Sequence, residues 1–78
     1  MEKEIFLHNV RQQFIDPDEI ELSFDSDFRK IESYDSLTGM TILVMLKDDF
    51  GVDITETEYK TKLTVGDLYE YVLIHKKT

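Results

Sequence analysis

The sequence contains no cysteine, so neither a disulfide framework nor a thiolate metal site can stabilise it, and packing must do so instead. No apolar run approaches the roughly 20 residues that a membrane-spanning helix needs. The opening residues, Met1 to Glu4, lack the basic-then-apolar order of a signal peptide. These absences predict a cytoplasmic protein that does not insert into a membrane.

Positive charge is scarce, because nine Lys and Arg residues stand against 17 Asp and Glu, for a formal net charge of −8. Nucleic-acid binding needs a basic surface that displaces counterions from phosphates, so nucleic acid is not an expected partner. The charge favours proteins with basic surfaces instead. The 78 residues, 41% of them hydrophobic, are enough for one small core, and we expect a single domain over residues 1–78.

Groups typical of enzyme active sites are also few. His8 and His75 lie near opposite ends of the chain, and there is neither a cysteine nucleophile nor a glycine-rich phosphate loop. An acidic cluster at residues 16–21 lacks the spacing and central glycine of a calcium-binding loop, so we interpret it as a solvated turn. The sequence therefore predicts a protein that is not an enzyme and holds no metal ion.

Two long helices are predicted in the first two thirds of the chain. Residues 3–15 place apolar side chains at helical spacing, and Asp16-Pro17-Asp18 ends this first helix. Residues 37–50 form the most helical segment of the sequence, and Gly51 is a suitable residue for its C-terminal cap.

A long connection up to about Tyr34 separates these two helices. Its charged residues alternate with isolated apolar ones, a period of two that imitates a strand. We interpret it as an ordered loop, because its Asp and Ser residues favour turns and its apolar residues can anchor it to a helical core. The anchors are Ile20, Leu22, Phe24, Phe28 and Ile31.

Two further helices are predicted after Gly51. Residues 54–59 offer side-chain oxygens for a cap and leave room for only a short helical turn. Thr64 and Asp67 resemble a capping box that opens a last helix reaching about Lys76, and Lys76 and Lys77 suit the negative end of its dipole. The sequence thus predicts three longer helices, one short helix and a long ordered loop between the first two.

The second helix carries two apolar stripes on opposite faces. At 100° per residue, the inner stripe consists of Ile42, Leu43, Leu46 and Phe50, with Gly39 among them. The outer stripe consists of Leu37, Met40 and Val44, with Thr41 and Asp48 beside it. An exposed apolar stripe with an acidic rim is typical of a docking site for another protein. The alternative is that neighbouring helices bury both stripes.

Several segments resemble acyl carrier proteins. Tyr34-Asp35-Ser36-Leu37 opens the second helix and Asp48-Asp49-Phe50-Gly51-Val52-Asp53-Ile54 ends it, as in that family. Ser26 to Arg29 and Leu63 to Leu68 are similar to the family's loop and to the start of its last helix. The resemblance covers residues 26–72 and implies an all-α, monomeric, four-helix acyl-carrier-like bundle.

The resemblance implies that Ser36 carries 4′-phosphopantetheine, transferred from coenzyme A by a separate magnesium-dependent phosphopantetheinyl transferase. The arm would carry acyl intermediates as thioesters in fatty-acid, lipid or polyketide-type biosynthesis. A helix start suits this role, since its backbone amides and dipole favour the phosphodiester. Asp35 is expected to cap the helix and to contact the transferase with Leu37, and Ser36 is expected to share the capping.

The expected partners are this transferase and acyl-transferring, ligating or condensing enzymes with basic docking surfaces. The expected contact residues are Asp35, Leu37, Met40, Val44, Asp48 and Asp49. Two alternatives are open: a peptidyl or aminoacyl carrier, or a small acidic helical interaction module without a prosthetic group, in which Asp35 or Ser36 only caps the helix.

The sequence departs from the family's pattern at two places. Ser33 stands where many fatty-acid carriers have glycine. Thr38, Thr41 and Lys47 stand along the second helix, where family members often place acids. These departures favour a specialised lipid, polyketide or peptide pathway over bulk fatty-acid synthesis.

Overall fold

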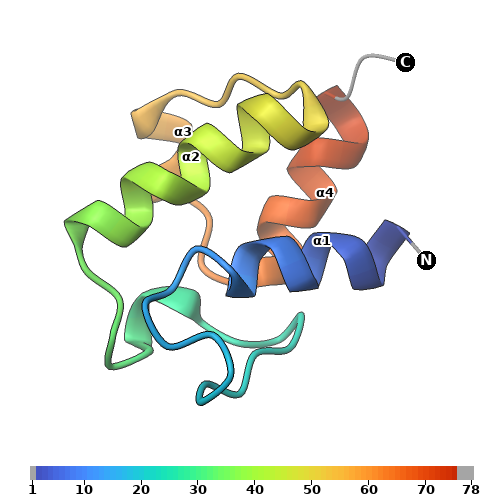
Figure 1. The fold of residues 1–78 in the computed structure, drawn as a ribbon. Coiled ribbons are helices and arrows are strands. Elements are labelled where there is room, and N and C mark those ends of the chain that lie inside the picture. Colours follow the sequence, from blue (N-terminus) through green and yellow to red (C-terminus); the bar gives the residue numbers. More distant parts are fainter. Residues whose placement is uncertain (1, 76–78) are drawn as a thin grey trace.

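The computed structural model describes residues 2–75, which form four α-helices and one short 3-10 helix (Figure 1). The elements are α1 (Glu2–Arg11), η1 (Phe28–Lys30), α2 (Ser36–Phe50), α3 (Glu56–Lys60) and α4 (Val65–His75). No strand occurs within these residues, so the predicted all-α bundle with one short helix is confirmed. The lysines expected at the end of the last helix lie outside the described residues.

Helix α1 ends at Arg11, four residues before the predicted end. Beyond it the backbone tightens into turns, in which Gln13 N donates to Val10 O and Phe14 N to Arg11 O. Phe14 nevertheless remains buried, which is why the apolar spacing continued past the helix. Ile15 is 87% exposed and contributes nothing to the core.

The long connection between α1 and α2 is an ordered loop, as predicted. Leu22 and Phe28 are buried, and the other three anchors pack against the core. Its carbonyl groups also satisfy the first amides of α4, because Val65 N donates to Ser26 O and Gly66 N to Phe24 O. A Cβ atom at position 66 would lie 3.1 Å from Phe24 O, so this close approach explains the glycine.

The 3-10 helix η1 was not predicted from the sequence. Asp27 starts it by accepting a hydrogen bond from Arg29 N at 3.1 Å, and Phe28 is fully buried in it. Three residues are too few to show helical periodicity, so the apolar pattern of the sequence indicated only that Phe28 is buried.

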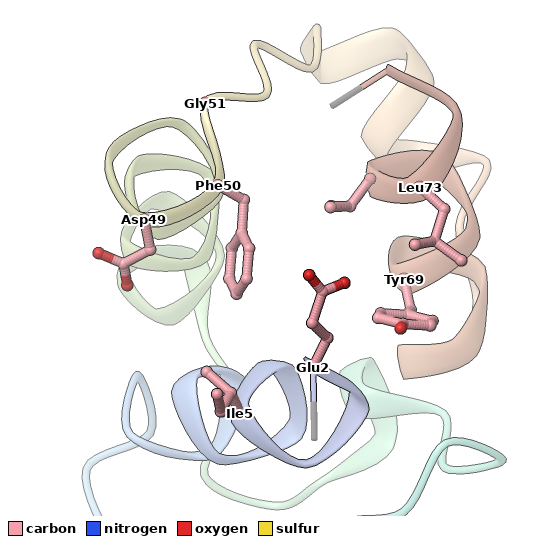
Figure 2. Close-up of a pocket in the computed structure, with 8 residues that line it drawn as sticks. Glu2, Ile5, Asp49, Phe50, Gly51, Tyr69 and Leu73 are labelled. Carbon is pink, nitrogen blue, oxygen red and sulfur yellow. The ribbon is translucent and has the colours of Figure 1, made fainter. Parts of the chain in front are cut away.

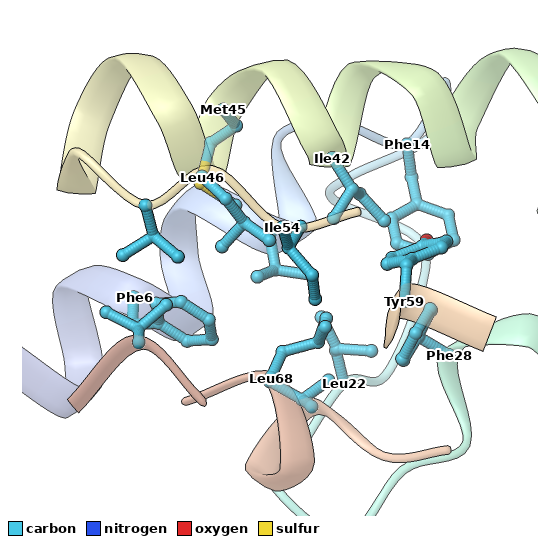
Figure 3. Close-up of a cluster of buried hydrophobic side chains, with 14 residues drawn as sticks. Phe6, Phe14, Leu22, Phe28, Ile42, Met45, Leu46, Ile54, Tyr59 and Leu68 are labelled. Carbon is cyan, nitrogen blue, oxygen red and sulfur yellow. The ribbon is translucent and has the colours of Figure 1, made fainter. Parts of the chain in front are cut away.

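The core gathers side chains from every helix and from the loop (Figure 3). Helix α2 contributes Ile42, Met45 and Leu46, and Figure 3 shows them pointing toward the loops and helices on its inner side. The predicted inner stripe is therefore partly wrong. Leu43 and Phe50 are only half-buried, because they border surface pockets on either side of α2.

The predicted capping box at the start of α4 is confirmed. Asp67 N donates to Thr64 Oγ1 at 3.1 Å, while Leu63 N and Thr64 N donate to Asp67 Oδ2 at 2.9 and 3.1 Å. These backbone hydrogen bonds stabilise the carboxylate and lower the pKa of Asp67 below its ordinary value of 3.8.

Replacing Leu46 by alanine tests the inner face of α2. Leu46 is fully buried, so Leu46→Ala should lower the free energy of unfolding by about 2–5 kcal/mol. Val44 is 56% exposed, and Val44→Ala should change it by no more than about 0.5 kcal/mol. Urea denaturation measures both, and equal losses would contradict the division of α2 into an inner and an outer face.

The capping box also predicts a pH dependence. Because the folded state lowers the pKa of Asp67, its stabilisation is full above the ordinary value of 3.8 and is lost as the pH falls through the folded pKa. The wild type should therefore exceed Asp67→Asn in urea midpoint near neutral pH, and the difference should shrink in acid. Glu70→Gln, at an exposed position on α4, controls for net charge. A difference that stays constant into strong acid would rule out this contribution.

Candidate functional site

The start of α2 is fixed by the side chain of Asp35. Its Oδ1 atom accepts hydrogen bonds from Thr38 N at 2.9 Å and from Thr38 Oγ1 at 3.0 Å. These bonds hold the pKa of the exposed Asp35 carboxyl below its usual range, with that from the Thr38 amide the largest cause. Asp35 is thus the N-cap, as predicted, and the helix begins at the next residue.

Ser36 is the first residue of α2 and its side chain is exposed. The expectation that Ser36 shares the capping is wrong, because Asp35 alone supplies the capping oxygen. No hydrogen bond within residues 2–75 uses the Ser36 hydroxyl. The hydroxyl is therefore open to solvent at the positive end of a 15-residue helix.

A pocket of about 370 Å³ opens beside Ser36, between α2, α3 and the loop that precedes α2. Its lining includes Gly39 and Leu43 of α2, Tyr59 and Lys60 of α3, and Tyr34 of the loop. The hydroxyl groups of Tyr34 and Tyr59 are hydrogen-bonded to each other at 3.1 Å. The pocket thus extends from Ser36 to this pair of hydroxyl groups, which lies next to Gly39, about one turn along α2 from Ser36.

Arg29 holds this wall of the pocket together. Its guanidinium lies over the rings of Phe28 and Tyr59, 4.8 and 4.6 Å from their centroids. It also donates hydrogen bonds to the backbone carbonyl groups of Tyr59 and Lys62. One side chain of η1 therefore ties the loop to α3 and to the chain that follows it.

The outer stripe of α2 is exposed, so the alternative in which neighbours bury both stripes is wrong. Leu37, Met40 and Val44 are 67%, 63% and 56% exposed. They line a groove of about 430 Å³ that also includes Asp48 and Asp49. All of the residues expected to contact partners thus lie on one side of α2 or at its start.

A further pocket of about 440 Å³ lies at the other end of α2 (Figure 2). Phe50 and Ile5 face it from α2 and α1, and Tyr69 and Leu73 face it from α4. Fourteen residue steps of α2 separate it from Ser36, which is about 21 Å along the helix axis. Of the predicted site residues, Asp49 alone lines it.

Sequence reasoning missed the groups that line the pocket beside Ser36. The sequence places Gly39 only within the inner stripe of the second helix, and Tyr34 only within the motif before that helix. A Cβ atom at position 39 would lie 2.6 Å from the Tyr34 hydroxyl, so glycine lets this hydroxyl reach the helix backbone. The signal was a mid-helix glycine, which costs roughly 1 kcal/mol relative to alanine.

The histidines and the acidic cluster are the other groups that the sequence analysis considered for an enzyme or metal site. His8 and His75 are both exposed, and the His75 ring stacks on Tyr71 at 4.0 Å. Within residues 2–75, no three His, Asp or Glu side chains are grouped to hold a metal ion. In the same part of the chain, no helix has the length and apolar character needed to cross a membrane.

Comparison with known proteins assigns the chain to a family. The family model of the phosphopantetheine attachment site matches residues 8–72. The chain is 39% identical over 56 residues to an acyl carrier protein of Renibacterium salmoninarum, a stretch that covers 72% of this chain and 67% of that protein.

Two further curated relatives carry the same name. An acyl carrier protein of Rickettsia bellii is 34% identical over 56 residues, covering 72% of this chain and 65% of its own length. One of Beutenbergia cavernae is 37% identical over 51 residues, covering 65% and 62%. No solved structure matches the chain significantly. The chain therefore belongs to the acyl carrier protein family, whose members carry acyl groups as thioesters on a covalently attached 4′-phosphopantetheine group.

Proposed function

We propose that Ser36 is the attachment point of the 4′-phosphopantetheine arm. The observation that supports this most strongly concerns the start of α2. Asp35 caps the helix there, and the exposed Ser36 hydroxyl makes no hydrogen bond within residues 2–75. A phosphodiester at this position lies at the positive end of the helix dipole. The pocket beside Ser36 is lined by two cations, Arg29 and Lys60, against one acid, Glu56.

The start of α2 suits the arm that the family carries, because the exposed Ser36 hydroxyl stands at the positive end of the helix beside this pocket. When bound, the arm supplies a terminal thiol that forms the thioester with the acyl group. The chain itself keeps the attachment point exposed to solvent and provides the pocket between α2 and α3 beside it. We therefore propose a single carrier domain over residues 1–78 that catalyses no reaction itself.

The outer stripe of α2 is the surface we propose for docking. Its apolar residues are exposed beside the attachment point, and Asp48 and Asp49 lie along the same groove. The proposed partners are the phosphopantetheinyl transferase and acyl-transferring, ligating or condensing enzymes with basic docking surfaces. Acidic residues at the rim steer such partners into contact, while central apolar residues keep them bound.

The departures from the family pattern still favour a specialised pathway, but Thr38 no longer counts among those on the docking surface. Thr38 is buried and donates a hydrogen bond to Asp35, so it belongs to the cap rather than to the docking surface. Lys47 is exposed and does change the charge of α2. We infer that enzymes of a dedicated lipid or polyketide-type pathway serve this carrier better than general fatty-acid synthase enzymes do.

Modification with coenzyme A tests the attachment site. Incubation with coenzyme A, magnesium and a broad-specificity phosphopantetheinyl transferase should add one phosphopantetheinyl group, measured by intact mass spectrometry. Ser36→Ala should abolish the addition and change the free energy of unfolding by no more than about 0.5 kcal/mol, because the side chain is exposed and does not cap. Ser33→Ala is the matched control and should still be modified. Addition to Ser36→Ala would refute the assignment, and a wild type that is never modified would favour the interaction module.

Transfer kinetics across a salt series test the docking surface. The double variant Asp48→Lys with Asp49→Lys should slow modification most at low ionic strength, because salt screens charges at an interface rim. Met40→Glu should slow it at every salt concentration, because it places a charge within the apolar stripe. Glu70→Lys and Ile74→Glu, both at exposed positions on α4, are the controls. Unchanged rates in both α2 variants would place the docking surface elsewhere.

A further inference from the structure

The lining of the pocket beside Ser36 combines the apolar side chains of Met40 and Leu43 with one polar point, the hydroxyl pair of Tyr34 and Tyr59. Tyr59 is 7% exposed, and its hydroxyl bonds that of Tyr34 next to Gly39. Beneath this pair, the fully buried Phe28 contacts both rings at centroid distances of 5.9 and 5.8 Å. The rings of Phe28, Tyr34 and Tyr59 are therefore packed against one another between this pocket and the core.

The hydrogen-bond inventory of the tyrosine pair leaves one donor unused. Two hydroxyl groups carry two protons, and the bond between Tyr34 and Tyr59 uses one of them. No other hydrogen bond within residues 2–75 uses either hydroxyl. Both residues line the pocket, so the remaining proton can be donated to a ligand there.

The tyrosine pair also stays protonated. Burial raises the pKa of the Tyr59 hydroxyl well above its ordinary value of 10.0, and the hydrogen bond with Tyr34 raises it further. At this point of the pocket a neutral hydroxyl donor favours an oxygen acceptor, because a methylene group placed against it would leave the hydroxyl without a partner.

From this arrangement we propose that the pocket beside Ser36 binds a short acyl group that bears an oxygen substituent, held by the Tyr34–Tyr59 hydroxyl pair, and that long saturated acyl chains stay outside the bundle. The proposal rests on the attachment of the arm at Ser36. Tyr34 and Tyr59 then determine the cargo class, because their hydroxyls both supply the donor and close the route to the core.

The experiment compares three thioesters loaded on Ser36 of the full chain, with 3-hydroxybutyryl, butyryl and dodecanoyl groups as probes. Mass spectrometry first confirms that each is loaded. The readout is the rate of cleavage by hydroxylamine, divided by that of the corresponding free pantetheine thioester to remove intrinsic reactivity. A hydrogen bond in the pocket should protect the 3-hydroxybutyryl group about two- to tenfold relative to butyryl.

Variants of the two tyrosines test whether their hydroxyl groups cause the protection of the 3-hydroxybutyryl thioester. The double variant Tyr34→Phe with Tyr59→Phe keeps both rings, removes both hydroxyl donors and should bring the protection back to that of butyryl. Tyr69→Phe, in the pocket at the far end of α2, is the matched control and should change nothing. Amide chemical shifts give a second readout: the 3-hydroxybutyryl group should move the signals of Gly39 and Tyr59, and dodecanoyl should leave the core residues Leu46 and Leu68 unmoved.

The outcomes separate this proposal from the one on which it rests. Normal loading with equal protection of all three groups would overturn the assignment of cargo and leave the attachment site standing. So would strong protection of dodecanoyl with shifts at Leu46 and Leu68, which would show a long chain inside the bundle. Absence of loading at Ser36 would overturn both proposals.

Discussion

The hydrogen bond from the Thr38 amide to the Asp35 carboxylate determines where α2 starts, and the arrangement of the site depends on that start. Since a helix turns 100° per residue, fixing its first residue fixes which side every later residue faces. Ile42 and Leu46 thereby reach the core, while Ser36 and the outer stripe face solvent. A shift of one residue would rotate both the attachment point and the docking surface away from their positions.

Two further contacts hold the surroundings of α2 in place. At its end, Gly51 adopts a left-handed conformation with φ of 68°, and its amide donates to the carbonyl groups of Leu46 and Lys47 in the last turn of the helix. Beside its start, the stacked Arg29 guanidinium joins η1 to α3, so the loop and the short helix together form the far wall of the pocket. These few polar contacts order the least regular segments of the fold.

Much of this architecture could be predicted from the sequence. Strong local signals defined α2, α3 and the capping box of α4, because caps and apolar periodicity act within a few residues. The predicted end of α1 was wrong, because Phe14 stays buried although the helix has already ended. The tyrosine pair could not be predicted, since Tyr34 and Tyr59 lie 25 residues apart and only the fold brings their hydroxyls together. The inner stripe was partly wrong because pockets flank α2 at Leu43 and Phe50, a tertiary feature that periodicity does not report.

The central claim is that the chain carries its prosthetic group on the first residue of α2. The most direct measurement is fragmentation mass spectrometry of the tryptic peptide of residues 31–47 from the modified protein. This peptide contains Ser33 and Ser36 as well as Thr38 and Thr41, so it distinguishes the exposed Ser36 hydroxyl from its neighbours. Our account predicts that every modified fragment contains Ser36 and that the arm is on this residue. An arm located on Ser33, or on either threonine, would contradict it.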